Sequence, residues 1–140
     1  MNAGLAVRVD WRTCLSLIGV VLEALAVPLG LTAVVALLSG ESVVPFVVPA
    51  VLTLAVGFTL RRFDRGDLGL REGYLIVALT WLAIVVVGAL PFVVAGNGEL
   101  ATPVNALFES TSGVTTTGAT VVADFDAHGR SIHLWRSILQ

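Results

Sequence analysis

Charge, cysteine and histidine are all scarce in this sequence of 140 residues. Only 13% of its residues are charged, which is about half the share in an ordinary soluble domain. The one cysteine, Cys14, excludes an intramolecular disulfide, and together with His128 and His133 it is too little for a Cys/His zinc site. All eight cationic residues are arginine, so a Walker-type phosphate loop lacks its lysine. A net charge of −2 without a basic tract gives no support for nucleic-acid binding.

Apolar residues are what the sequence has in excess. They make up 56% of the chain, and the mean hydropathy is +0.94. Because a charge at the centre of a bilayer is costly, the gaps between charged residues outline membrane spans. Three gaps reach the roughly 20 residues that a spanning helix needs: residues 13–40, interrupted only by Glu23, residues 42–60 and residues 73–98. The sequence therefore predicts an all-α, multi-pass membrane protein.

The first gap has a competing interpretation as a signal peptide. Arg8 and Arg12 precede it, and residues 24–26 (ALA) resemble a cleavage site. The apolar stretch continues through Leu38, well past the hydrophobic region of a signal peptide, and this favours a membrane span.

The distribution of arginine predicts the orientation of the spans, since cytoplasmic connections carry the excess of positive charge. Arg8 and Arg12 precede the first span, and the turn around Glu41 has no arginine. Residues 61–72 hold four arginines, whereas residues 99–130 hold one. We therefore expect the amino terminus and residues 61–72 to be cytoplasmic, and the other two connections to be external. Among the tryptophans, Trp11 and Trp135 suit the membrane interfaces, and Trp81 suits packing within its span.

Residues 99–113 begin like a helix that is too short to cross a membrane. Thr102 suits an N-cap, Pro103 a first helical residue and Gly113 the C′ position that stops a helix. About ten residues at roughly 1.5 Å each give a helix of about 15 Å, half the hydrocarbon thickness. A half-span helix is what a re-entrant pore helix requires.

Four threonines surround one glycine in the next segment, residues 114–122. Threonine favours extended backbone, and glycine can adopt the positive φ that turns successive carbonyls toward one axis. After a half-span helix, such carbonyls could replace the hydration shell of a cation. An external threonine-rich loop and an ordinary strand are the alternatives, and composition and spacing do not choose between them.

Four stretches, in a fixed order, resemble the TrkH subunits of the Trk/Ktr/HKT potassium-transporter superfamily. They are residues 70–81 (LREGYLIVALTW), 88–92 (GALPF), 106–120 (ALFESTSGVTTTGAT) and 134–140 (LWRSILQ). The resemblance covers about residues 65–140, whereas residues 1–60 match only in hydropathy, as the two additional amino-terminal helices that TrkH-type proteins carry.

The resemblance implies an architecture of four non-identical helix, pore loop, helix repeats around one potassium path. Residues 1–64 would hold the two amino-terminal transmembrane helices and a cytoplasmic loop, and residues 65–140 the first repeat, truncated in its last helix. The family continues past the position of Gln140 with three further repeats, so we expect the chain to be an amino-terminal fragment.

The resemblance also implies a site. The filter glycine of the family corresponds to Gly118, and the carbonyls that coordinate K⁺ map onto Thr116 and Thr117, with Gly118 and Ala119 adjoining. The side chain of Thr120 is expected only to pack. The implied transported ion is K⁺, without a cofactor. Complete relatives are implied to form membrane dimers and to work with a cytosolic nucleotide-binding regulatory subunit.

Two acidic residues interrupt apolar segments. Glu109 lies in the predicted half-span helix, four residues before Gly113, where it either hydrogen-bonds backbone amides of the filter or faces external water. A buried, isolated carboxylate is costly, so together with the resemblance we expect Glu109 to support the filter. Glu23 lies within the first span and suits either a functional or a packing role.

The function that we expect from the sequence is potassium uptake across the cell membrane, with this chain contributing the first of four selectivity-filter loops. A small, non-transporting membrane anchor or assembly subunit is the alternative. Ser110 and Ser112 have no base at a diagnostic spacing, so the sequence predicts no enzyme activity.

Overall fold

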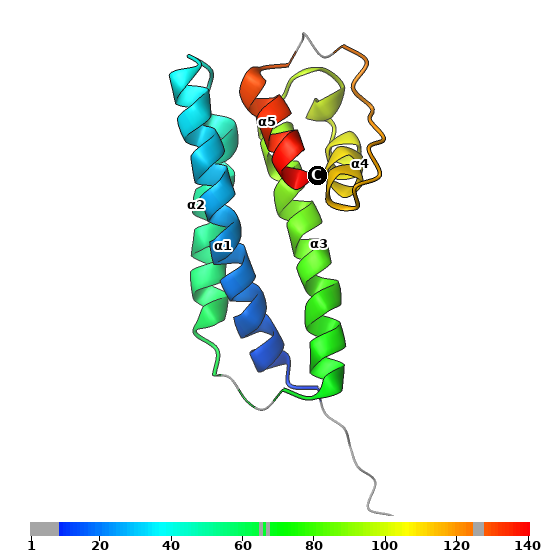
Figure 1. Cartoon of the computed structure of the whole chain (residues 1–140). Coiled ribbons are helices and arrows are strands. Elements are labelled where there is room, and N and C mark those ends of the chain that lie inside the picture. The colour runs from blue at the N-terminus through cyan, green and yellow to red at the C-terminus, as the bar shows by residue number, and fades with distance from the viewer. Residues whose placement is uncertain (1–8, 65, 67, 125–127) are drawn as a thin grey trace, which may run out of the picture.

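The computed structural model describes residues 9–64, 66, 68–124 and 128–140. Over these residues the chain is helical and contains no strand (Figure 1). The helices are α1 (Trp11–Leu38), α2 (Val44–Arg61), α3 (Leu70–Ala95), the 3₁₀ helix η1 (Gly98–Ala101), α4 (Pro103–Val114) and α5 (Arg130–Leu139). Arg8 and Arg65, two of the arginines on which the predicted orientation depends, lie outside the described residues.

Three of these helices, α1, α2 and α3, are long and apolar enough to cross a membrane, as the gaps between charges predicted. The third helix starts three residues before its predicted span, because Arg71 and Glu72 belong to its first turn rather than to the preceding loop. A carboxylate in a first turn is favoured by the positive end of the helix dipole. A gap between charged residues predicts the part of a helix that lies in the hydrocarbon core of the membrane. It leaves out the charged turn at the end of the helix.

Asp10 starts α1 by capping it. Its carboxylate accepts hydrogen bonds from the backbone N–H groups of Arg12 (3.1 Å) and Thr13 (3.3 Å), and from the Thr13 hydroxyl (2.7 Å). These bonds, those from Thr13 first, hold the pKa of Asp10 below its ordinary value. The Thr13 hydroxyl in turn accepts the backbone N–H of Gly66 at 2.6 Å, so this cap also fastens the α2–α3 loop to α1.

Two glycines let α1 and α2 approach closely. A Cβ atom on Gly19 would lie 2.7 Å from the Gly57 carbonyl oxygen, and one on Gly57 would lie 2.8 Å from the Gly19 carbonyl oxygen. Small residues at such crossings are a common means of packing membrane helices. Next to this crossing, Glu23 pairs with Arg61 at 2.7 Å. The structure therefore gives Glu23 an ion-pair partner within the α1–α2 hairpin.

The short helices α4 and α5 lie at the end of the bundle where α1 turns into α2 (Figure 1). The chain leaves α3 through Gly96, whose φ of +65° ends that helix, and α4 then runs back beside the adjacent part of α3. Ser110 of α4 donates its hydroxyl to the Val85 carbonyl of α3 at 2.8 Å.

Trp135 lies at the centre of the packing of α5, and its place at a membrane interface stays a prediction. Its side chain is 1% exposed, donates its indole N–H to the Gly88 carbonyl of α3 at 2.9 Å, and packs edge-to-face on Phe46 of α2. Trp81, expected to pack within its span, is half exposed in this chain, whereas Trp11 is 57% exposed at the start of α1. The indole of Trp135 thus joins three helices.

Candidate cation-coordinating segment

The carboxyl end of α4 is a Schellman motif. Thr116 has a left-handed backbone (φ +55°) and donates its N–H to the Gly113 carbonyl at 2.8 Å, and Thr117 donates to the Ser112 carbonyl at 2.9 Å. These are the 5→2 and 6→1 bonds of that motif, with Thr116 at C′. The prediction that Gly113 is the C′ residue is therefore wrong by three positions.

Gly113 has a packing role inside α4. A Cβ atom at this position would lie 3.1 Å from the Cβ of Leu139, so the glycine lets α5 lie close against α4. Sequence reasoning took the only glycine near the expected end as the stop signal. The left-handed residue is instead a threonine, whose β-branched side chain makes that conformation uncommon.

The four residues predicted to coordinate K⁺ (Thr116, Thr117, Gly118 and Ala119) all lie in the exposed, non-helical chain directly after α4. Gly118 has a φ of +76°, so the segment contains two left-handed residues separated by one residue. A Cβ atom on Gly118 would meet nothing closer than the side-chain nitrogen of Gln140, at 3.9 Å. The requirement for glycine at this position therefore comes from the backbone conformation and not from crowding.

Hydroxyl groups fasten this segment to the end of α4. The Ser112 hydroxyl donates to the Ala119 carbonyl at 2.6 Å, which closes the loop between these residues. Thr115 donates its hydroxyl to the Thr111 carbonyl at 2.8 Å, and its oxygen lies 2.8 Å from that of Thr117. These side-chain bonds thus add to the two backbone bonds that form the turn.

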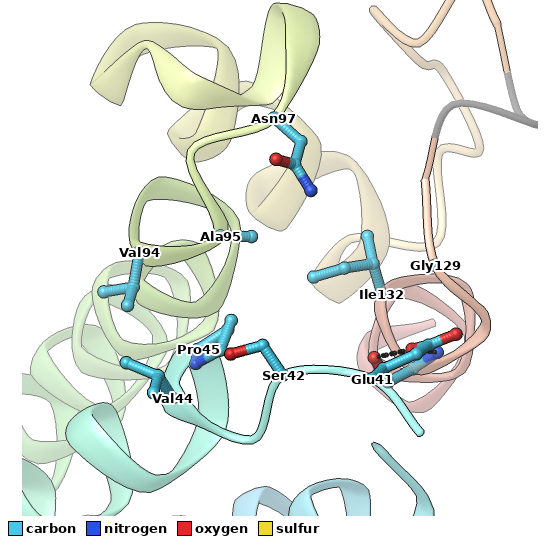
Figure 2. A pocket seen from close by; sticks show the side chains of 10 residues that line it. Glu41, Ser42, Val44, Pro45, Val94, Ala95, Asn97, Gly129 and Ile132 are labelled. Atoms are coloured by element: carbon cyan, nitrogen blue, oxygen red, sulfur yellow. Dashed lines mark hydrogen bonds between the residues drawn. The ribbon is translucent and has the colours of Figure 1, made fainter. Parts of the chain in front are cut away.

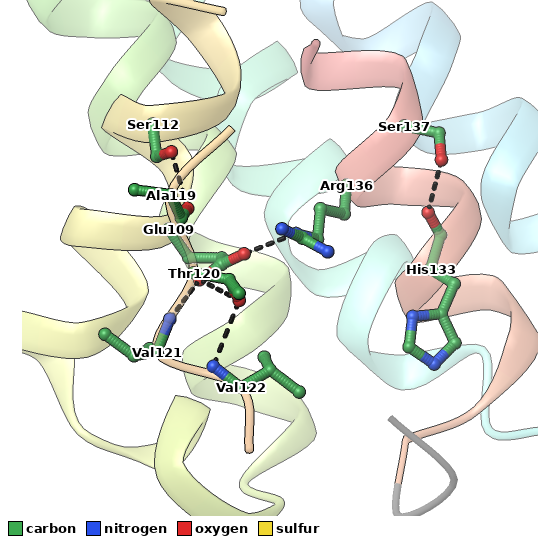
Figure 3. A network of polar contacts seen from close by, with 9 residues as sticks. All are labelled: Glu109, Ser112, Ala119, Thr120, Val121, Val122, His133, Arg136 and Ser137. Carbon is green, nitrogen blue, oxygen red and sulfur yellow. Dashed lines mark hydrogen bonds and ion pairs between the residues drawn. The ribbon is translucent and has the colours of Figure 1, made fainter. Parts of the chain in front are cut away.

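Glu109 lies behind the far end of the same segment (Figure 3). Its side chain is 1% exposed, and one carboxylate oxygen accepts the Val121 N–H and the Thr120 hydroxyl, both at 3.1 Å. The other oxygen forms an ion pair with the guanidinium of Arg136 on α5. The structure thus places Glu109 beneath the chain that follows Ala119, with a cation to balance its buried charge.

The Thr120 side chain does more than pack. Its hydroxyl donates to Glu109 and accepts the Val122 N–H at 3.0 Å (Figure 3). The expectation that this side chain contributes only packing is corrected by these two bonds. A serine at this position would keep both of them.

Sequence reasoning missed the role of Glu41, which caps α5 from the turn between α1 and α2. Its carboxylate accepts the backbone N–H groups of Arg130 (2.7 Å) and Ser131 (2.9 Å), together with the Ser131 hydroxyl. These bonds, that of the Ser131 hydroxyl first, hold the pKa of Glu41 below its ordinary value despite partial burial. A pocket of about 470 Å³ opens beside Glu41, lined among others by Pro45, Asn97 and Ile132 (Figure 2).

One sequence signal could have pointed to this cap. The residue before α5 is Gly129, which has no side chain to accept the first N–H groups of the helix. The first backbone N–H groups of a helix without its own capping side chain need a hydrogen-bond acceptor from another part of the chain. The sequence does not say which residue supplies it, because Glu41 lies 89 positions from Arg130.

Comparison with known proteins identifies the family. A family model for TrkH, described as a cation transport protein, matches residues 44–140. The chain belongs to the TrkH family. Among TrkH relatives, the Trk system potassium uptake protein TrkH of Vibrio parahaemolyticus is 36% identical over 136 residues, which is 94% of this chain and 28% of that protein. The Escherichia coli K12 protein of the same name is 44% identical over 92 residues, or 64% of this chain and 19% of that protein.

The fold agrees with this assignment. The crystal structure of the potassium transporter TrkH from Vibrio parahaemolyticus matches with a TM-score of 0.83 and 33% identity, over 94% of this chain and 29% of that one. The chain therefore spans less than a third of the length of these TrkH relatives. The family consists of transport proteins and not of enzymes, and with three apolar helices this TrkH-family chain is a multi-pass membrane protein.

Proposed function

We propose that the chain takes part in potassium uptake across the cell membrane and contributes the first of four selectivity-filter loops. One observation carries the proposal: the exposed segment after the half-length helix α4 has left-handed residues at Thr116 and Gly118 and is fastened to α4 by side-chain hydroxyls. Relatives named as potassium uptake proteins support the choice of ion. The resemblance supports the division into residues 1–64 and a first repeat in residues 65–140.

The backbone is the chemical group that acts in this proposal. The carbonyl oxygens of Thr116 and Thr117, with those of Gly118 and Ala119 adjoining, replace part of the hydration shell of K⁺. The Ser112 hydroxyl takes one of the two lone pairs of the Ala119 carbonyl and leaves the other for an ion. One segment cannot enclose an ion, so the site is complete only with three further loops.

Glu109 supports this segment in the proposal by holding the Val121 N–H immediately after it. A carboxylate that accepts a backbone N–H from a buried position fixes the chain more firmly than a neutral acceptor. The contact with Arg136 offsets the cost of burying that charge.

The wider setting of the proposal follows from the family and from the arginine distribution. The amino terminus and residues 61–72 face the cytoplasm, with Arg61 and Arg62 ending α2 and Arg71 starting α3. The complete protein works as a homodimer, surrounded by membrane lipid, with a cytosolic nucleotide-binding Trk regulatory subunit. It needs no cofactor, and K⁺ is the transported ion.

The test compares Gly118→Ser with Thr120→Ser in the protein at its full encoded length. A side chain at a φ of +76° adds strain of roughly 1–2 kcal/mol and turns the neighbouring carbonyls away, so Na⁺ uptake should rise relative to K⁺ uptake. Thr120→Ser is the matched control, because it keeps both hydroxyl bonds. The measurement is the concentration dependence of K⁺ and Na⁺ uptake at matched expression. An unchanged ion preference in Gly118→Ser would remove this segment from the filter.

A further inference from the structure

One side chain of the turn between α1 and α2, that of Glu41, binds the start of α5. Both oxygens of the Glu41 carboxylate are engaged with the first turn of α5, one with the Arg130 N–H and the other with the N–H and hydroxyl of Ser131. A negative charge at this place also interacts favourably with the positive end of the helix dipole. The α5 helix supplies no capping side chain of its own, so Glu41 is its cap.

Gly129 leaves room for the Glu41 carboxylate because it has no side chain. A Cβ atom on Gly129 would lie 2.7 Å from a carboxylate oxygen of Glu41 and 2.8 Å from its carboxyl carbon. Any other residue would therefore require the Glu41 carboxylate to shift at the start of α5. The contact depends on two residues far apart in sequence, and a substitution at either of them should disturb it.

The helix that Glu41 holds carries the cation that pairs with Glu109. Arg136 lies five residues after Ser131, about 8 Å further along the helix at roughly 1.5 Å per residue. Its guanidinium contacts Glu109, whose other oxygen holds the Val121 N–H at the end of the candidate filter segment. A shift of α5 along its axis therefore moves the partner of Glu109.

We propose that Glu41 is a positioning residue for ion selection. Through the start of α5 it sets Arg136 against Glu109, and so fixes the backbone that follows Ala119. This inference rests on the proposed function, because it gives the α1–α2 turn a part in the same filter. Trp135 restrains the middle of α5 by its bond to the Gly88 carbonyl, so loss of Glu41 should shift or fray the first turn of the helix without releasing it.

The test uses Glu41→Gln and Gly129→Ala in the protein at its full encoded length. The control is Glu99→Gln, at an exposed carboxylate in η1 that takes no part in the contacts to α5 described above. Uptake of K⁺ and Na⁺ is measured against concentration, after normalising to the amount of protein in the membrane. We expect Glu41→Gln and Gly129→Ala to change the KM for K⁺ several-fold and to raise Na⁺ uptake relative to K⁺ uptake, and Glu99→Gln to do neither.

A double variant tests the route. If Glu41 acts through Glu109, then adding Glu41→Gln to Glu109→Gln should change the ion preference no further. Independent effects that multiply in the double variant would overturn the proposal. So would a loss of uptake that only follows a loss of protein from the membrane, with KM and ion preference unchanged.

Two further variants keep the outcome decisive. Ser131→Ala removes only the hydroxyl bond to Glu41, so it should change the KM for K⁺ and the ion preference in the same direction but by less. If Glu41→Gln does not reach the membrane, Ser131→Ala becomes the deciding variant. Gly118→Ser separates this inference from the proposed function. If Gly118→Ser alters ion preference and the Glu41 and Ser131 variants do not, only the role of Glu41 is refuted, whereas an unaltered Gly118→Ser refutes the filter itself.

Discussion

At the scale of single residues, Glu109 and Arg136 form an ion pair from which neither member can be removed without cost. Glu109 is 1% exposed, and the Arg136 side chain is 23% exposed. Removing one member of a buried pair leaves an uncompensated charge, which typically costs several kcal/mol, whereas removing both members costs far less. The pair therefore ties the candidate filter segment to α5 in a way that neither residue does alone.

We predict that Glu109→Gln destabilises the chain by about 3 kcal/mol and that Glu109→Gln with Arg136→Gln restores part of this loss. Glutamine keeps an acceptor for the Val121 N–H, so the difference reports the charge. The measurement is thermal unfolding in detergent, with Glu99→Gln as a control at an exposed carboxylate. A double variant less stable than Glu109→Gln would show that the pair does not balance a buried charge.

At the scale of helices, glycine decides how closely the elements pack. Gly19 and Gly57 bring the backbones of α1 and α2 together, and Gly113 admits Leu139 of α5 against α4. Gly30, in the same helix as Gly19, faces open space. The two α1 glycines share their backbone conformation and differ in their surroundings, which makes them a matched pair.

We predict that Gly19→Ala loosens the α1–α2 hairpin, because its Cβ would lie 2.7 Å and 2.8 Å from the backbone of α2. Gly30→Ala should be neutral or stabilising by up to about 1 kcal/mol, since alanine is the better helix former. Thermal unfolding of both variants in the same detergent checks this. Equal stability of the two variants would mean that the close crossing of the hairpin is not required.

The same scale shows how far local sequence rules extend. The gaps between charges located three helices, and Thr102 and Pro103 located the start of α4. The end of α4 was misplaced, because a threonine at 116 adopts a conformation that glycine would take more easily. Tertiary contacts of the segment, such as the bond between Ser112 and Ala119, offset that local cost.

Contacts between distant residues were out of reach of such rules. The cost of a buried carboxylate, together with the family resemblance, led us to expect Glu109 near the backbone of the filter, and Glu109 accepts the Val121 N–H. Charge and spacing did not predict that Arg136 pairs with Glu109 or that Glu41 caps α5, because both depend on how α5 packs against the other helices. The burial of Trp135 was missed for the same reason.

At the scale of the whole molecule, the arginines predict how the chain sits in the membrane. The connection from α2 to α3 lies at the opposite end of the bundle from α4 and α5 (Figure 1). These two ends should therefore face different compartments. The excess of arginine in residues 61–72 predicts that this end is cytoplasmic.

We predict that a cysteine at Asp64 is protected from a membrane-impermeant thiol reagent in intact cells and that one at Ala123 is labelled. Both positions are exposed, and the background is Cys14→Ala, so neither site competes with a native thiol. Permeabilised cells serve as the control, in which both positions should react. Labelling at position 64 but not at 123 in intact cells would reverse the orientation.

The Glu41 cap on α5 forms late during synthesis of the chain. Glu41 and its partner Arg130 are 89 residues apart, and at roughly 5–20 residues per second the ribosome takes about 4–18 s to make the intervening chain. The α1–α2 hairpin, whose contacts are close in sequence, is complete well before this interval ends. During synthesis Glu41 is therefore without its partner while α3 and α4 are made, and its contact with α5 can form only after both of these helices have been synthesised.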